Sequence, residues 1–192
     1  NWEDNIYVKS KFMAEGLVRR AIDEGLNAKI FRLGRLVGRA EDGKFQINPE
    51  SNAFYLFLRG IAQLGSISRR AARTRIELTP IDLCVNRVLA LRDASGTVYH
   101  IMNENPPTMA EILNVVCPDC RIVTAVDFAK AIKAKSKTPE GKFLPFVLSN
   151  LQMTGPRRDA IRVSNRLTVD ALKAAGYTEA EYKLETILKD FE

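Results

Sequence analysis

Apolar residues recur with helical spacing near the start of the chain, at Phe12, Leu17, Val18 and Ile22. A recurrence every three to four residues is typical of an amphipathic helix. Gly25 follows at a position where helices commonly end. The pattern therefore predicts that a helix opens the chain and ends at this glycine.

Short apolar runs alternate with further helical patterns along the rest of the chain. The predicted strands are residues 28–33, 97–102 and 121–126, and the main predicted helices are residues 51–65, 80–91, 108–116 and 165–176. The alternation through residue 103 indicates an α/β fold, and the remainder is mainly helical.

Local capping signals refine the predicted helix starts. Thr79 before Pro80 is an N-cap and first-turn signature, and residues 108–111 form a capping box. Asp127 is predicted to cap the helix that follows the third strand. A second capping box, beginning at Thr178, predicts a last helix.

The composition is that of an ordinary globular protein, with 46% hydrophobic and 27% charged residues. No apolar run approaches the roughly 18 residues of a membrane span, and the first residues lack the pattern of a signal peptide. The chain begins without methionine and is soon within a helical pattern. From its start we expect the chain to be part of a longer protein. From the lack of a long apolar run we expect no membrane partner.

The cysteine and histidine content limits the chemistry. Three cysteines without secretory context favour reduced thiols in a cytoplasmic protein. Cys117 and Cys120 form one C-x-x-C, but a structural zinc site needs four ligands, and only Cys84 and His100 remain. No metal site is predicted. A single histidine also disfavours most Ser-His-Asp and multi-histidine metal mechanisms.

The net charge is +6, and the densest basic stretch is "RRAARTR", at residues 69–75. Such a stretch is consistent with an acidic or phosphorylated partner, and equally with a solvated loop. No aromatic residue interleaves with these arginines. A stacking platform for single-stranded nucleic acid is therefore not expected.

Tyr7 and Lys11 are four residues apart on the first predicted helix, so their side chains share one face. A free phenol has a pKa of about 10, and a nearby ammonium group lowers it by favouring the phenolate. A phenol tuned in this way can give a proton to a carbonyl oxygen while hydride arrives at its carbon. By itself the spacing is common, so its meaning depends on context.

The context is an ordered set of motifs: "YVKSKFMAE", then a helix and a strand, then "RLGRLVG", and later "TPID". This set resembles the C-terminal half of an extended short-chain dehydrogenase/reductase. The longer stretches "SKFMAEGLVRRAIDEGLNAKIFRLGRLVG", "FLRGIAQLG" and "TVYHIMNENPPTMAEIL" resemble the thioester reductase domains of non-ribosomal peptide synthetases and carboxylic acid reductases. The resemblance covers nearly the whole chain and is most specific through Leu113.

The resemblance implies an α/β fold, comprising the C-terminal part of a Rossmann-type parallel sheet and a small, mainly helical substrate subdomain. The implied divisions are residues 1–48 (catalytic helix, strand and nicotinamide-side loop), 49–75 (a substrate-subdomain helix and the basic loop), 76–103 (the last Rossmann helix and strand) and 104–192 (the C-terminal substrate subdomain).

The resemblance also implies roles for individual residues. Tyr7 would donate the proton, and Lys11 would bind the nicotinamide ribose and polarise Tyr7. The backbone bordering the nicotinamide would be that of Leu33, Gly34 and Arg35, with Val37 packing nearby. A plain turn after the strand remains the alternative for Gly34 and Gly38. Asp82 is interpreted as a cap or anchor rather than an acid, and Ser10 as a surface hydroxyl.

Two parts of such a site are not found in this sequence. No G-x-x-G-x-x-G follows a strand, so the loop that holds the cofactor pyrophosphate is expected upstream. The family's catalytic Ser or Thr is expected upstream as well. The isolated chain is thus expected to be inactive, and its first strand to lack a neighbour on one side, which favours self-association through that edge.

The function implied is NADPH-dependent hydride transfer to an acyl thioester on a phosphopantetheinyl carrier protein, giving an aldehyde or alcohol. Two alternatives stay open. A nucleotide-sugar epimerase or dehydratase of the same superfamily shares the tyrosine and lysine. A non-catalytic module that docks a carrier protein would need neither.

Overall fold

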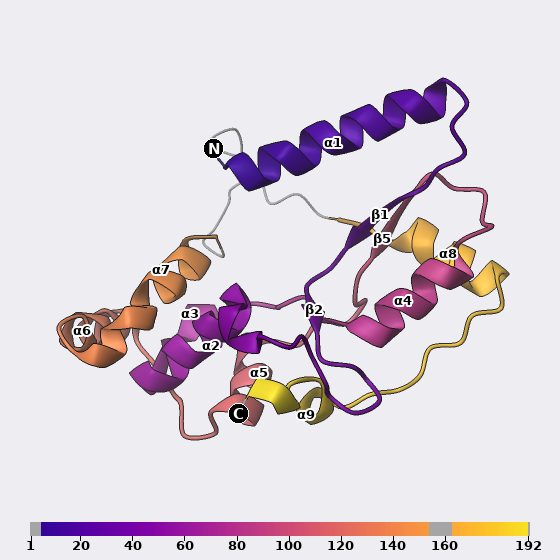
Figure 1. Ribbon diagram of the computed structural model, residues 1–192. Helices are drawn as coiled ribbons and strands as arrows, with labels where there is room; N and C mark the ends of the chain where they lie inside the picture. Colours follow the sequence, from indigo (N-terminus) through magenta and orange to yellow (C-terminus); the bar gives the residue numbers. More distant parts are fainter. Residues whose placement is uncertain (1–4, 154–162, 192) are drawn as a thin grey trace.

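The computed structural model describes residues 5–153 and 163–191 (Figure 1). Its helices are α1 (Ile6–Asp23), α2 (Ala53–Leu64), α3 (Arg69–Ala72), α4 (Ile81–Ala90), α5 (Met109–Val116), α6 (Ala125–Lys135), α7 (Leu144–Met153), α8 (Arg166–Ala174) and α9 (Leu184–Ile187). Its strands are β1 (Ile30–Leu33), β2 (Leu36–Val37), β3 (Ser66–Ser68), β4 (Thr79–Pro80), β5 (Val98–Ile101) and β6 (Arg121–Val123). Short 3-10 helices are η2 (Pro49–Ser51), η3 (Pro139–Phe143) and η4 (Lys189–Phe191).

The strands of the described residues form three parallel pairs: β1 with β5, β2 with β4, and β3 with β6. In the first pair the register runs from Ile30 opposite Val98 to Leu33 opposite Ile101. Parallel neighbours require long crossover connections, which the intervening helices provide. The α/β fold class is confirmed, and the first two predicted strands lie side by side as β1 and β5.

The larger hydrophobic core surrounds α2. Tyr55, Leu58 and Ile61 of this helix are fully buried, and it packs against α7, η3, α5 and α6. Residues of α9 and η4 join the same core from the C-terminal end of the chain. The nearly continuous apolar character of α2 is explained by this burial on most of its circumference.

A second, smaller core lies between β5, α4 and α8, on the right of Figure 1. It contains Cys84, Leu91, Tyr99, Ile101 and Leu172. Alternate residues of β5 enter it, as expected for a strand with one face against helices.

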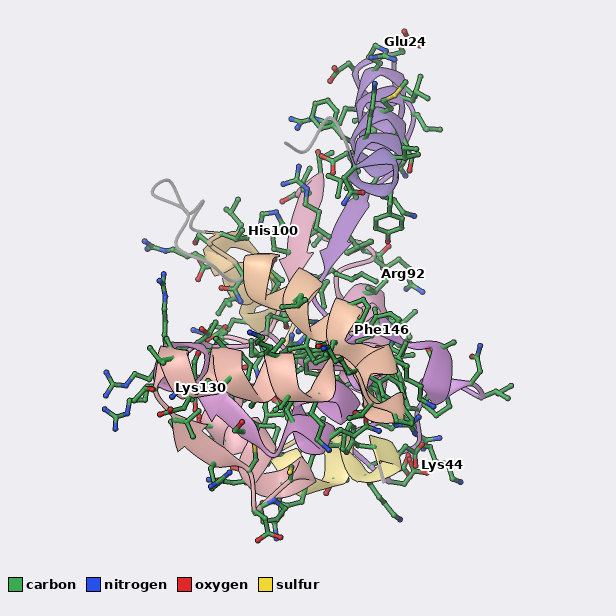
Figure 2. The ribbon with its side chains drawn as sticks, turned by 90° about the vertical axis from the view of Figure 1, so that its left-hand side faces the viewer. Glu24, Lys44, Arg92, His100, Lys130 and Phe146 are labelled. Carbon is green, nitrogen blue, oxygen red and sulfur yellow. The ribbon has the colours of Figure 1, made fainter. Side chains whose placement is uncertain are left out.

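Helix α1 stands apart from both cores at the top of Figure 1 and has no buried residue. An ion pair tethers it to the sheet: Arg32 on β1 donates to Glu15 from Nε (3.0 Å) and from Nη2 (2.5 Å). Nη1 of Arg32 lies 3.0 Å from Nε2 of His100, whose Nδ1 is 3.1 Å from the carbonyl oxygen of Ser164. Since Arg32 only donates, Nε2 accepts and Nδ1–H donates to Ser164, which fixes the neutral tautomer. His100 is labelled in Figure 2.

Several predicted helix signals are confirmed. Thr108 and Glu111 form both bonds of the capping box of α5. Helix α1 is followed by Gly25 with a positive φ of 104°, and α2 ends at Gly65 with φ 60°. These glycines allow the left-handed conformation that terminates a helix.

Other capping predictions are wrong. Thr79 lies in β4, with its hydroxyl donating to Glu77 (2.5 Å), so it does not cap α4. Thr124, not Asp127, is the N-cap of α6, and Asp127 accepts from the Thr124 hydroxyl. Thr178 does not open a helix, because the neighbouring Glu179 binds Arg87; α9 begins only at residue 184.

Within residues 5–153 and 163–191, no helix combines the length and the apolar character needed to cross a bilayer.

Candidate active site

Tyr7 and Lys11 lie in the first two turns of α1, which begins after Asn5, whose side chain accepts from the backbone N–H of Val8. The Lys11 Nζ is 5.6 Å from the centroid of the Tyr7 ring, so the two side chains share one face. The Ser10 hydroxyl donates to the Tyr7 carbonyl oxygen (2.8 Å), consistent with a helix-surface role. Tyr7 is 70% exposed and therefore accessible to a ligand.

The loop after β1 is held by Glu77, a residue that the sequence analysis did not single out. Its carboxylate accepts hydrogen bonds from the backbone N–H of Arg35, the Thr79 hydroxyl and the backbone N–H of Asn103 (3.0 Å). It thereby joins the ends of the neighbouring strands β1 and β5. The sequence feature that could have pointed to Glu77 is its position as a single acidic residue between the apolar residues Ile76 and Leu78, which are both buried.

Gly34 lies against this carboxylate. A Cβ at position 34 would be 2.2 Å from Oε2 of Glu77 and 2.4 Å from Cδ. A plain post-strand turn does not require such proximity, so the absence of a side chain at Gly34 makes room for Glu77 beneath the loop.

Gly38 lies where the C-terminal segment crosses the same loop. Its N–H donates to the carbonyl oxygen of Ile187 (3.1 Å), and a Cβ there would be 2.4 Å from the Gly43 carbonyl oxygen. The backbone N–H of Phe45 donates to Asp190 (2.8 Å). Contacts between segments so distant in sequence leave no local signal, and the sequence analysis missed them.

Asp82 anchors the loop to the start of α4. Its carboxylate accepts from the backbone N–H groups of Ala40 (2.8 Å) and Glu41 (3.2 Å), and from its own neighbour Leu83 (2.9 Å). With its oxygens bound to the main chain, it has the anchoring role predicted for it.

One open cavity of about 590 Å³ has both Tyr7 and Arg35 in its wall. Its apolar wall comprises Leu36, Phe45, Phe54 and Ile81, and its other polar residues are Gln46 and Asn52. The cavity therefore brings the first turn of α1 together with the loop after β1 and the start of α2.

The remaining predicted site residues do not line this cavity and have different environments. Lys11 adjoins Tyr7, and Leu33, at the end of β1, is 48% exposed. Val37 is fully buried in the larger core, so it supports the loop from below and does not reach a ligand.

The donor groups present fit part of a nicotinamide cofactor. A tyrosine hydroxyl and a lysine ammonium on one helix face can bind ribose hydroxyls, and none of the described carboxylates pairs with Lys11. The exposed end of β1 at Leu33 lies at the carboxyl edge of a parallel sheet, where cofactors bind in open α/β folds.

The three cysteines are free thiols, with Cys84 buried and Cys117 and Cys120 half-buried. Burial, together with the nearby Cys117, raises the pKa of the Cys120 thiol to about 12. Among the residues that the structure describes, no group of three or more His, Cys, Asp or Glu side chains is placed to bind a metal ion.

Comparisons with known proteins agree with this architecture. Residues 1–88 match the NAD-binding family described as "Male sterility protein". A non-canonical nonribosomal peptide synthetase of Aspergillus hancockii, hkm10, is 28% identical over 108 residues, which are 56% of this chain and 10% of the synthetase.

Solved structures match over a much larger part of the chain. A thiolation-reductase di-domain from an archaeal non-ribosomal peptide synthetase has a TM-score of 0.78 and 28% identity, covering 96% of this chain and 40% of that one. The reductase domain of the Aureusimine biosynthetic cluster has a TM-score of 0.80 at 18% identity, over 96% of this chain and 50% of its own, and shares the fold. By motifs, sequence and fold, this chain is thus similar to the thioester reductase domains of nonribosomal peptide synthetases, of the short-chain dehydrogenase/reductase type.

Proposed function

We propose that this chain is part of an NADPH-dependent thioester reductase that acts on an acyl group carried by a phosphopantetheinyl carrier protein. The product would be an aldehyde, or an alcohol after a second reduction. The observation that carries the proposal is the Tyr7–Lys11 pair on one helix face, with Tyr7 in the wall of the cavity that it shares with Arg35.

The chemistry assigns a distinct task to each residue. A nicotinamide bound there would supply hydride to the thioester carbonyl carbon, and the resulting hemithioacetal would break its C–S bond to release the aldehyde and the carrier-bound thiol. Tyr7 gives the proton to the carbonyl oxygen, and its exposure leaves the hydroxyl accessible to a substrate. The ammonium of Lys11, on the same helix face as Tyr7, offers donors to ribose hydroxyls. The backbone from Leu33 to Arg35 borders the nicotinamide and is held in place by Glu77.

We further propose that another part of a longer protein completes the site with the pyrophosphate loop and the catalytic Ser or Thr. The outer edge of β1 has no strand partner among the described residues, and the apolar side chains of α1 are exposed. The chain also spans only 40% to 50% of the solved reductases that it matches. These features support the expectation that the chain alone binds no NADPH and turns over no thioester.

The test is thioester reduction by the intact reductase that contains this chain. Tyr7→Phe removes the proton donor and is expected to lower turnover by roughly 10²- to 10⁴-fold. Lys11→Ala is expected to lower turnover and to weaken NADPH binding. Lys9→Ala, an exposed lysine on the same helix, is the matched control and should behave as wild type.

Near-wild-type thioester reduction by Tyr7→Phe would contradict the proposed proton donor. Binding of a sugar nucleotide with turnover to an epimerised or dehydrated product would favour the epimerase/dehydratase alternative. Fluorescence titration of the chain alone tests the incomplete site, and micromolar affinity for NADPH would contradict it.

A further inference from the structure

Arg35 lies in the wall of the cavity, where one contact positions its backbone and another positions its side chain. Its backbone N–H is bound to Glu77, and its Cζ lies 4.3 Å from the centroid of the Phe54 ring. Phe54 is 5% exposed, at the start of α2, so the guanidinium rests on a rigid surface. Stacking on an aromatic face leaves the N–H edges of an arginine available to a ligand.

The guanidinium has no acceptor among the described residues. Glu77 is the nearest acidic influence, but its carboxylate is already bound to three other donors, two of them backbone N–H groups. Desolvation lowers the pKa of Arg35 and the charge of Glu77 opposes that change. A guanidinium stays protonated in proteins, so Arg35 remains a cation.

The rest of the cavity adds donors and apolar surface. Oδ1 of Asn52 accepts from the backbone N–H groups of Phe54 and Tyr55, so its amide NH₂ is the group left for a ligand. Leu36, Phe45 and Ile81 provide hydrocarbon walls. A wall of donors beside apolar surface is complementary to an apolar group that carries an accepting oxygen.

We infer that Arg35 is a specificity-determining residue that binds an oxygen of the acyl group, so that acyl thioesters with an amide carbonyl or a carboxylate near the thioester are preferred over plain alkanoyl thioesters. This inference rests on the proposed function. It names a substrate class and a role for the guanidinium, separate from the role of the Arg35 backbone beside the cofactor.

The experiment uses the intact reductase and three pantetheine thioesters of similar length: an N-acetylaminoacyl thioester, a dicarboxylic monothioester and an alkanoyl thioester. Arg35→Met is expected to lower kcat/KM for one or both oxygen-bearing thioesters by about 10- to 100-fold, the range of a charged hydrogen bond. The alkanoyl thioester should lose much less, and a thermal unfolding curve like that of the wild type shows that the variant is folded. If only the N-acetylaminoacyl thioester loses kcat/KM, the acceptor is an amide oxygen; if only the dicarboxylic monothioester does, the acceptor is a carboxylate.

Two further variants sharpen the test. Arg35→Lys keeps the charge but not the planar fork, and should restore part of the preference. Arg39→Met removes an exposed arginine from the same loop, outside the cavity, where it pairs with Glu41 and Asp42; its selectivity should equal wild type.

An equal loss on all three thioesters with Arg35→Met would assign Arg35 to holding the loop and overturn the inference, as would no change on any of them. If the wild-type reductase reduced none of the three thioesters, the proposed function itself would fail, and the inference with it.

Discussion

The carboxylate of Glu77 lies directly against Gly34, within 2.4 Å of where a Cβ would stand. The same carboxylate holds the N–H groups of Arg35 and Asn103, so it cannot move without releasing both loops. The proximity of these two residues sets the path of the chain as it leaves β1.

Gly34→Ala is therefore expected to destabilise the fold by about 1–3 kcal/mol, the usual cost of inserting a methyl group into a packed site. Gly16→Ala is the matched control. At that position in α1 the nearest atom to a Cβ is the end of the Arg20 side chain at 3.9 Å, so the change should be neutral or stabilising by up to about 1 kcal/mol. Urea unfolding of both variants measures the difference; equal stabilities would contradict the crowding at Gly34.

Arg87 and Glu179 form a two-pronged ion pair that fixes the segment after α8. Nε of Arg87 is 3.0 Å from Oε2 and Nη2 is 2.5 Å from Oε1, and Arg87 is only 7% exposed. Glu179→Gln leaves the buried guanidinium without its counter-charge and is expected to cost about 1–3 kcal/mol in unfolding free energy. Glu181→Gln, at an exposed position two residues on, should cost nothing measurable. Similar losses in the two variants would mean that the pair does not stabilise the fold.

The tether of α1 to the sheet is expected to weaken in acid. Hydrogen bonding to Arg32, with smaller contributions from the charges of Arg32 and Arg19, lowers the pKa of Glu15 from its ordinary value of 4.5, against the opposing effect of burial. A carboxylate with a lowered folded pKa stabilises the fold at pH values above 4.5, and that contribution is lost as pH falls through the folded pKa.

Arg32→Met should raise the pKa of Glu15, measured by NMR titration of its carboxyl group. The unfolding free energies of this variant and the wild type should converge as the pH falls below 4.5. Arg19→Met removes a weaker contact of 4.0 Å and should shift the pKa less. An unchanged titration in Arg32→Met would show that the tether does not form in solution.

The basic stretch at residues 69–75 presents exposed arginines whose charge would complement an acidic carrier protein of the kind proposed above. Arg69, Arg70 and Arg73 are exposed and have no carboxylate partner among the described residues, whereas Arg75 donates to the carbonyl oxygen of Pro106 (2.8 Å). If this surface steers a carrier, Arg69→Glu with Arg73→Glu should lower kcat/KM for a carrier-bound thioester and flatten its salt dependence. The control is Lys133→Glu with Lys137→Glu, which makes the same charge change in α6 and just after it. This control should leave kcat/KM and its salt dependence unchanged. Equal salt slopes in both double variants would assign the arginines to solvation alone.

The exposed margin of the β1–β5 pair predicts self-association of the isolated chain. On α1, Ile6 is 84% exposed, Phe12 65% and Leu17 61%, and the free edge of β1 presents unpaired backbone groups among the described residues. Sedimentation should therefore show oligomers at high micromolar concentration. A monomer with slow amide exchange in Ile30–Leu33 would contradict this prediction.

The sequence determined several helices and strands and the pairing of Tyr7 with Lys11. Helical spacing and Gly25 placed α1, the apolar run placed β1, and a local capping box placed the start of α5. The four-residue separation of Tyr7 and Lys11 was enough to put them on one face, because the period of a helix is fixed by its backbone. Each of these signals involves residues close together in the sequence, so the local geometry of the backbone is enough to determine the structure that forms.

The tertiary structure decided what surrounds that pair. Glu77 beneath Gly34, the C-terminal segment against Gly38, and Arg35 over Phe54 are contacts between distant segments. The cap predicted at Thr79 failed for the same reason, because the Thr79 hydroxyl donates to Glu77, and the residue after Thr178, Glu179, is bound to Arg87. Side-chain partners of this kind depend on how helices and strands pack, and the periodicity of the sequence carries no information about that packing. Only the folded structure therefore shows which hydrogen-bond donors and acceptors meet.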